Sequence, residues 1–353
     1  MRLERRPAAS PLALVLAPVG AVAFTLLVST LLVLWAGAPV APTWAAVLRG
    51  GFGSTFAWSE TLTRATPLIL TGLAAAVAFR ARLYNIGAEG QLYAGALAAV
   101  AVGGLQAGEA SGLPASVLAA CMFAAAALAG ALLLLGPALL KAKLGVDEVV
   151  TTLLLNFIVL LGVSALLDGP MKDPTAMGWP QSVALASELE LARLVEGTRV
   201  HTGLLYAMGL AVILWALLRF TLFGFDVRAL GANSRAAAFA GVPPVRTLAW
   251  VALLSGALAG LAGAIEVAGR AGYVTLDMSP GYGYSGIVIA MLAGLHPLAV
   301  VTAAVFVAGI QVGADSMSRV VGVPTYIADV IVSASLVSVL VATLLAQHRV
   351  RWR

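Results

Sequence analysis

Long apolar stretches separated by short polar ones set the pattern of this chain. Crossing a hydrocarbon core of about 30 Å takes a helix of about 20 apolar residues. By that measure the sequence predicts an all-α membrane protein of ten spans, at 12–36, 62–79, 86–106, 114–136, 149–167, 203–219, 247–268, 285–296, 298–314 and 326–346. The second and eighth are short, so they are either broken helices or spans that borrow flanking polar residues. Nine or eleven spans would also fit.

The polar connection at 220–246 carries its own helix signals. Asn233 or Ser234 can cap a helix N-terminus, and Gly241 suits the left-handed residue beyond a helix end. The prolines at 243 and 244 stop its continuation. We therefore expect a short helix between the sixth and seventh spans. The other long connection, 168–202, contains the run Ser187-Glu-Leu-Glu-Leu-Ala-Arg-Leu, for which a short surface helix and a plain loop are both open.

Composition agrees with a chain that lies in lipid. Hydrophobic residues make up 61% and charged residues 10% of it, with a mean hydropathy of +0.99. A soluble protein carries about 25% charged residues. We expect one transmembrane domain over 1–353. Cys121 is the sole cysteine, which excludes an internal disulfide and a thiolate metal site, and its apolar surroundings predict a buried, inert thiol.

The basic residues predict the orientation of the chain. Short cytoplasmic tails at 1–11 and 347–353 would place 14 of the 21 Lys and Arg residues inside, as the positive-inside rule requires. Orientation explains the formal charge of +5 better than a nucleic-acid partner does. Neither tail nor any connection contains the Gly-x-x-x-x-Gly-Lys-Ser/Thr arrangement, so the chain does not bind ATP by that loop.

Polar side chains at membrane depth are the main pointer to function. Asn85, Glu89 and Gln91 lie in the run Tyr84-Asn-Ile-Gly-Ala-Glu-Gly-Gln-Leu, where the third span begins. Unpaired polar groups cost several kcal/mol in lipid, so they face a partner or a pathway. One interpretation is structural, with Glu89 complementing the dipole of its own helix and Asn85 capping it. The other is that they line a passage.

Three further residues are candidates for the same pathway. Asn156 lies in the middle of the fifth span, where a hydrogen bond between helices is the alternative interpretation. Tyr284 belongs to the glycine-rich run 279–286, which is either an aromatic belt or a re-entrant segment. Asp329 lies one turn inside the tenth span.

Two other patterns in the seventh span have simpler explanations. Gly256, Gly260 and Gly263 form a seam of small residues that predicts close helix packing. Glu266 and Arg270 stand four residues apart, at the spacing of a helical ion pair. The three histidines have no carboxylate or serine partner at a telling spacing, so the sequence does not indicate an enzyme.

The motifs together resemble a known family. The stretches are Tyr84-Asn-Ile-Gly-Ala-Glu-Gly-Gln-Leu, Arg228-Ala-Leu-Gly-Ala-Asn with the following Ala-Gly-Val, and Gly281-Tyr-Gly-Tyr-Ser-Gly-Ile. They resemble permease subunits of ABC importers for ribose, branched-chain amino acids and nucleosides. The runs that begin at Gly145 and Gly169 are similar to the nucleoside branch, whose importers depend on basic membrane proteins.

The resemblance implies partners for the chain. A second permease, the same or unlike, would pair with it around a central pathway in the bacterial inner membrane. An extracytoplasmic lipoprotein would deliver the solute, and a cytoplasmic ATPase would bind ATP, so this chain needs no cofactor of its own. The ATPase would contact a coupling helix at 228–241, through Arg228, Gly231, Asn233, Arg235, Ala237, Phe239 and Gly241.

The expected function is import of a small polar solute by alternating access, through inverted repeats of spans 2–5 and 7–10. Amides, a carboxylate and aromatic rings suit a nucleoside or purine. Sugar uptake is the alternative within the same family. A proton-coupled secondary transporter, with Glu89 or Asp329 carrying the proton, is the alternative outside it.

Overall fold

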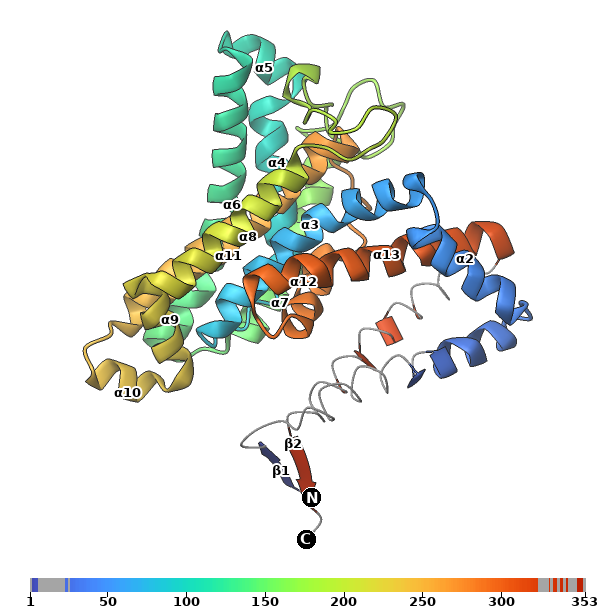
Figure 1. The fold of residues 1–353 in the computed structure, drawn as a ribbon. Coiled ribbons are helices and arrows are strands. Elements are labelled where there is room, and N and C mark those ends of the chain that lie inside the picture. The colour runs from blue at the N-terminus through green and yellow to red at the C-terminus, as the bar shows by residue number, and fades with distance from the viewer. Residues whose placement is uncertain are drawn as a thin grey trace. The chain divides into compact units, whose positions relative to one another are not determined.

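The computed structural model describes residues 2–5, 23–24, 26–322, 330, 333–334, 337–338, 341 and 348–351 (Figure 1). The chain forms two compact units, one of residues 62–304 and one of residues 1–61 with 305–353. Their boundaries fall within α3 (Thr55–Arg80) and α13 (Pro297–Val321). The single transmembrane domain expected over 1–353 stays a prediction.

The larger unit contains most of the helices. Besides the greater part of α3 and the start of α13, it comprises α4 (Ala88–Gly103), α5 (Leu105–Ser111), α6 (Ala115–Leu144), α7 (Glu148–Asp168), the single turn η1 (Ser187–Leu189), α8 (Gly203–Phe220), α9 (Leu222–Ala232), α10 (Ser234–Phe239), α11 (Pro244–Glu266), the π-helical turn η2 (Val267–Ala271) and α12 (Tyr282–Leu292).

Helices occupy the predicted spans, but the count of ten is not confirmed. Six helices in the described part of the chain are long and apolar enough to cross a membrane: α3, α6, α7, α8, α11 with η2, and α13. The first span is described as a helix over Leu26–Trp35, and most of the tenth lies outside the described residues. The inverted repeat therefore stays a prediction. At 11 residues, α12 is about 16 Å long, which makes the eighth span a short helix.

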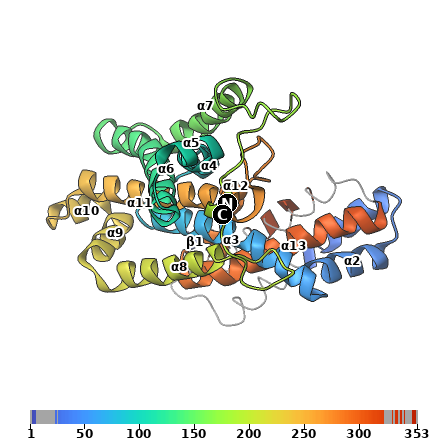
Figure 2. The ribbon, with the colours of Figure 1, turned by 90° about the horizontal axis from the view of Figure 1, so that it is seen from above.

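Glycines bring three helices of the larger unit into backbone contact (Figure 2). A Cβ added to Gly260 of α11 would lie 2.2 Å from the carbonyl oxygen of Ala126 on α6. One added to Gly263 would lie 1.9 Å from that of Leu92 on α4. The predicted small-residue seam is confirmed, because only hydrogen fits at these positions. Residues 65–78 of α3 are all buried, as expected of a helical stretch that is apolar on nearly all sides.

Cys121 corrects one expectation. It lies on α6 and is exposed, although its apolar neighbours predicted a buried thiol. The reason is that α6 turns its small-residue face, with Ala126 and Gly130, toward α4 and α11, and leaves its other face uncovered. Hydrophobicity in a membrane chain does not separate residues that face protein from those that face lipid.

The loop at 169–202 is held by backbone hydrogen bonds rather than by a helix, since η1 is only one turn. The N–H of Ser182 donates to the carbonyl of Val274 at 3.0 Å, and that of Leu191 donates to Ala268 at 2.8 Å. At the end of this loop, His201 is buried, with no hydrogen bond to its Nδ1 within the described chain. Gly269 of η2 is packed against its ring.

The smaller unit contains a helix that the sequence pattern missed. α2 (Val40–Phe52) has 13 residues and stands between the first two spans. It packs on α13 through glycine, because a Cβ on Gly51 would lie 2.4 Å from the carbonyl oxygen of Gly309. Val33, Ala46, Ala314 and Met317 form the apolar core there. The strands β1 (Arg2–Arg5) and β2 (His348–Arg351) pair antiparallel within this unit.

Candidate functional site

Asn85 and Gln91 form a reciprocal amide pair in the interior of the larger unit. Asn85 Nδ2 donates to Gln91 Oε1 at 2.9 Å, and Gln91 Nε2 donates to Asn85 Oδ1 at 2.9 Å. Asn85 Nδ2 also donates to Ser255 Oγ on α11 at 3.2 Å, and its Oδ1 accepts from the N–H of Gly87 at 2.9 Å. Both side chains are fully buried. The pair fixes the loop before α4 against α11.

Asn156 of α7 forms hydrogen bonds with the backbone at the start of α4. Its Oδ1 accepts from the N–H of Gly90 at 2.8 Å, and its Nδ2 donates to the carbonyl of Ile86 at 2.9 Å and to the hydroxyl of Tyr284 at 3.1 Å. A Cβ on Gly90 would lie 2.9 Å from Asn156 Oδ1, so glycine lets the two helices approach. Asn156 therefore forms the hydrogen bonds between helices that one interpretation expected, and the same side chain also binds Tyr284, another of the predicted pathway residues.

Glu89 is directed at a different helix from its own. Its Oε2 accepts a hydrogen bond from the N–H of Gly283, in the first turn of α12, at 2.6 Å. A carboxylate at a helix N-terminus is stabilised by the unpaired N–H groups and by the helix dipole. Glu89 also stands in the first turn of its own helix, α4, as the structural interpretation expected, and it adds a contact between α4 and α12.

The segment before α12 is tied to its neighbours at two more points. Tyr93 Oη donates to the carbonyl of Leu276 at 2.5 Å and accepts from the N–H of Ser279 at 3.2 Å. Thr71 Oγ1 of α3 donates to the carbonyl of Tyr282 at 3.0 Å. These bonds hold an irregular segment inside the protein, which is where such backbone is tolerated at membrane depth.

The structure thus brings five of the six predicted pathway residues into three hydrogen-bonded contacts around the start of α4: Asn85 with Gln91, Asn156 with Tyr284, and Glu89 with Gly283. Four of them are buried in the described conformation, and only Tyr284 is appreciably exposed, at 38%. Their direct contact with a solute stays a prediction. The sixth residue, Asp329, lies outside the described residues.

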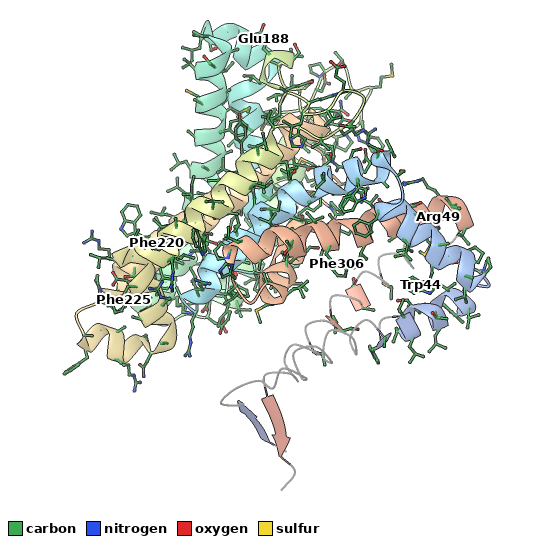
Figure 3. All side chains as sticks on the ribbon, viewed as in Figure 1. Trp44, Arg49, Glu188, Phe220, Phe225 and Phe306 are labelled. Atoms are coloured by element: carbon green, nitrogen blue, oxygen red, sulfur yellow. The ribbon has the colours of Figure 1, made fainter. Side chains whose placement is uncertain are left out.

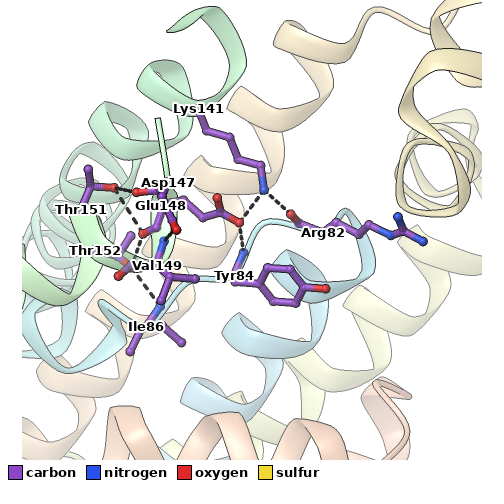
Figure 4. A network of polar contacts seen from close by, with 9 residues as sticks. All are labelled: Arg82, Tyr84, Ile86, Lys141, Asp147, Glu148, Val149, Thr151 and Thr152. Carbon is purple, nitrogen blue, oxygen red and sulfur yellow. Dashed lines mark hydrogen bonds and ion pairs between the residues drawn. The ribbon is translucent and has the colours of Figure 1, made fainter. Parts of the chain in front are cut away.

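A charged network that the sequence did not indicate lies where α6 meets α7 (Figure 4). Lys141 Nζ is paired with Glu148 and donates to the carbonyl of Arg82. Glu148 Oε1 also accepts from the N–H of Tyr84 at 3.1 Å. The turn between the helices follows from Gly145, whose φ of +69° ends α6, and from Asp147, which caps α7. The network fastens residues 82–84 to this turn.

A second set of polar side chains, Glu266, Arg270 and Tyr282, lies near the C-terminal end of α11. Glu266 forms the expected i,i+4 ion pair with Arg270, and its side chain is 1% exposed. Tyr282 is fully buried nearby, and its hydroxyl has no hydrogen bond within the described chain. Sequence spacing identified the ion pair. It gave no sign that the hydroxyl of Tyr282, on another helix, would be buried without a hydrogen bond in the described part of the chain.

The segment 228–241, expected as one helix, contains the end of α9 and all of α10. Asn233 separates them: its Oδ1 accepts from the N–H groups of Arg235 at 3.0 Å and Ala236 at 3.1 Å, which is the predicted N-cap. Gly241 has the expected positive φ, at +91°. Gly231 is where α9 meets α3, because a Cβ there would lie 1.8 Å from the carbonyl oxygen of Arg80.

The two apolar candidates for ATPase contact differ sharply in exposure. Phe239, the last residue of α10, is 98% exposed, whereas Ala237 is 5% exposed. Arg235 lines a hollow of about 470 Å³ beside α10, together with Arg82 and Lys141. A protruding aromatic ring next to basic side chains is a surface suited to a protein partner. Arg228 instead donates to the carbonyl of Leu218.

Comparison with known proteins identifies the family. The family described as "Branched-chain amino acid transport system / permease component" matches residues 57–340. The chain belongs to this permease family. Its members are transport permeases of ABC transporters, so the expectation of a transport subunit rather than an enzyme is confirmed.

Three curated relatives of this permease cover most of its length. The guanosine ABC transporter permease protein NupP of Bacillus subtilis is 35% identical over 90% of either chain. The nucleoside ABC transporter permease protein NupB of Lactococcus lactis is 29% identical over 91% of this chain and 89% of the relative. The glucose ABC transporter permease protein TsgB13 of Haloferax volcanii is 36% identical over 84% of this chain and 79% of the relative. The resemblance to the nucleoside branch is confirmed.

Proposed function

We propose that this permease forms the translocation pathway of an ATP-driven nucleoside importer. The observation that carries the proposal is the similarity, over about nine-tenths of the chain, to permeases named for guanosine and for nucleosides. The described structure supports it with membrane-length helices and with amide, hydroxyl and carboxylate groups at depth. Such groups suit a neutral solute that forms hydrogen bonds.

Sugar import is the second candidate, because the glucose permease is as similar to this chain as the guanosine permease is. The two substrate classes share a ring bearing hydroxyl groups, and they differ in the nucleobase. Tyr284 favours the nucleoside, since its ring is partly exposed beside Asn156 and can stack on a base.

The transport cycle we propose is alternating access driven from the cytoplasm. ATP binding would close a separate ATPase pair, and α10 would carry that movement to the spans as a rigid body. Support comes from Phe239, which protrudes from α10 with no contact to bury it. A second permease and an extracytoplasmic binding lipoprotein would complete the importer in the bacterial inner membrane. The pairing of β1 with β2 supports two chain ends on one side, which we assign to the cytoplasm.

The test is uptake into proteoliposomes that hold the co-purified complex. We expect radiolabelled guanosine to accumulate only with ATP and with the binding protein, and an excess of unlabelled nucleoside to compete better than glucose. Phe239→Glu is expected to uncouple the complex, so that ATP is still hydrolysed but uptake is lost. The thermal stability of the protein should stay unchanged. Ala237→Glu is the comparison, because a charge at that buried site should lower stability as well.

Two results would refute the proposal. Uptake driven by a proton gradient without ATP would show a secondary transporter. Competition by glucose but not by nucleosides would show the sugar importer instead.

A further inference from the structure

A hollow between α8, α9 and α11 has no role in the function proposed above. Its volume is about 790 Å³, and it lies wholly within the larger unit. Most of its wall is apolar, formed by Leu217, Phe223, Pro243, Trp250, Leu253 and Leu254. A wall of this kind suits an aliphatic chain.

Two opposite charges also line this hollow. Asp226 lines it from α9, and Arg246 lines it from α11, two residues after that helix begins. Within the described part of the chain, neither side chain takes part in an ion pair or a hydrogen bond. Leu254 lies eight residues further along α11, about 12 Å away. Along α11, the wall of the hollow is therefore charged near the N-terminus of the helix and aliphatic two turns further on.

The charged end lies at a surface with the features of a membrane boundary. Phe220 is 71% exposed, Leu222 is 84% exposed and Phe225 is 57% exposed at the junction of α8 with α9. Figure 3 shows Phe220 and Phe225 directed away from the helices. Apolar side chains that protrude beside Arg219 and Arg228 are typical of a helix lying at the headgroup level.

We propose that this hollow binds a phospholipid whose headgroup carries both a phosphate and a primary ammonium group, as in phosphatidylethanolamine. Arg246 binds the phosphate, because a guanidinium donates two parallel hydrogen bonds to it. Asp226 accepts from the ammonium group. One acyl chain lies along Leu217, Leu253 and Leu254. An amphiphile matches this order of charges and apolar wall, whereas a nucleoside has no aliphatic part to fill the inner end.

The choice between headgroups follows from Asp226. A quaternary ammonium, as in phosphatidylcholine, has no N–H to donate to the carboxylate. An anionic headgroup without an amine, as in phosphatidylglycerol, would bind Arg246 but offer Asp226 only neutral hydroxyl donors, so the charge of the carboxylate would stay uncompensated beside the phosphate. The pair of charges therefore selects a zwitterionic lipid that can donate hydrogen bonds.

The test is native mass spectrometry of the full chain purified with its partner subunits. Phosphatidylethanolamine, phosphatidylcholine and phosphatidylglycerol of identical acyl chains are added in separate arms. We expect phosphatidylethanolamine to be retained about tenfold better than the other two, as expected for one charge-assisted hydrogen bond. Asp226→Asn and Arg246→Gln should each lower its retention about tenfold, and Leu254→Trp should fill the aliphatic end and lower it for all three lipids.

Arg193→Gln is the matched control, because Arg193 is an exposed arginine that lies outside both this hollow and the expected ATPase contact. It should retain the lipid as the unmodified chain does. Equal retention of the three lipids, or full retention by both Asp226→Asn and Arg246→Gln, would overturn the proposal. A cysteine in place of Leu254 reports whether the hollow is accessible to solvent. If adding a partner protein or a nucleoside, rather than the lipid, made this cysteine inaccessible, the proposal would also be overturned. Thermal unfolding of each variant shows whether a lost lipid reflects a lost fold.

Discussion

Glu89 of α4 and Gly283 of α12 are 194 residues apart in the chain and share a hydrogen bond of 2.6 Å. A Cβ on Gly283 would lie 2.2 Å from the backbone nitrogen of Glu89, so the backbones meet as well. The carboxylate occupies the N-terminus of a helix that is too short to span the membrane alone. In this conformation Glu89 is an anchor of α12.

We predict that Glu89→Leu destabilises the protein by about 2 kcal/mol, because it leaves the buried N–H of Gly283 without an acceptor. Glu89→Gln retains an acceptor and should cost about half as much. Thermal unfolding of the purified protein measures both. Glu188→Gln, on an exposed side chain of the 169–202 loop, is the control and should stay within about 0.5 kcal/mol. If Glu89→Gln abolished uptake at unchanged stability, Glu89 would act on the solute or on a proton instead.

The amide pair of Asn85 and Gln91 should behave as one unit. We predict that the two alanine substitutions, combined in a double-mutant cycle, show a coupling of about 1 kcal/mol. Asn85→Ala alone should cost more than Gln91→Ala, because Asn85 also bonds Ser255 and Gly87. Chemical denaturation in detergent gives the values. Asn85→Ala combined with Asn233→Ala should be additive, and coupling there would contradict the separation of the two sites.

Replacing glycine by alanine should lower stability where two helix backbones are in contact and should have little effect where the glycine faces open space. Gly263→Ala is expected to destabilise the protein by about 1–3 kcal/mol, because its Cβ would lie 1.9 Å from the carbonyl oxygen of Leu92. Gly209→Ala, in the middle of α8 with nothing within 4 Å, should be neutral or stabilising by up to about 1 kcal/mol. The change in melting temperature measures both. Equal effects would mean that α4 and α11 do not approach as described.

Acid should destabilise the protein through His201, which precedes α8. Burial lowers the pKa of His201 from 6.5 to about 4. The unfolded chain therefore takes up this proton first, so stability present above about pH 6.5 is lost as the pH falls toward 4. We predict a loss of about 2 kcal/mol over that range, measured by thermal unfolding against pH. His201→Gln should flatten the profile, whereas His296→Gln, at an exposed histidine, should leave it unchanged.

Local signals in the sequence predicted the elements that depend on neighbouring residues. Asn233 and Gly241 correctly predicted where α10 begins and ends. The lengths of the apolar stretches predicted where the membrane-length helices lie. α2 was missed because its 13 residues are too few for a span. A search for apolar stretches of membrane-spanning length does not detect a helix of about half that length.

The candidate site was found by residue type, but its geometry was not. Asn85, Glu89 and Gln91 were recognised because polar groups at depth need partners. Their partners, Ser255 and Gly283, come from helices far along the chain, and no spacing rule connects them. For the same reason the Lys141–Glu148 network had no sequence signal, although Glu148 follows the recognisable cap Asp147.

The close approach at Gly231 has a mechanical consequence. No side chain stands between α9 and the carbonyl of Arg80, the last residue of α3. Flexible side chains absorb small displacements, whereas main chain resting on main chain does not. A force applied to α9 is therefore delivered undamped to the helix at the centre of the larger unit, and a single added methyl group would wedge the two apart.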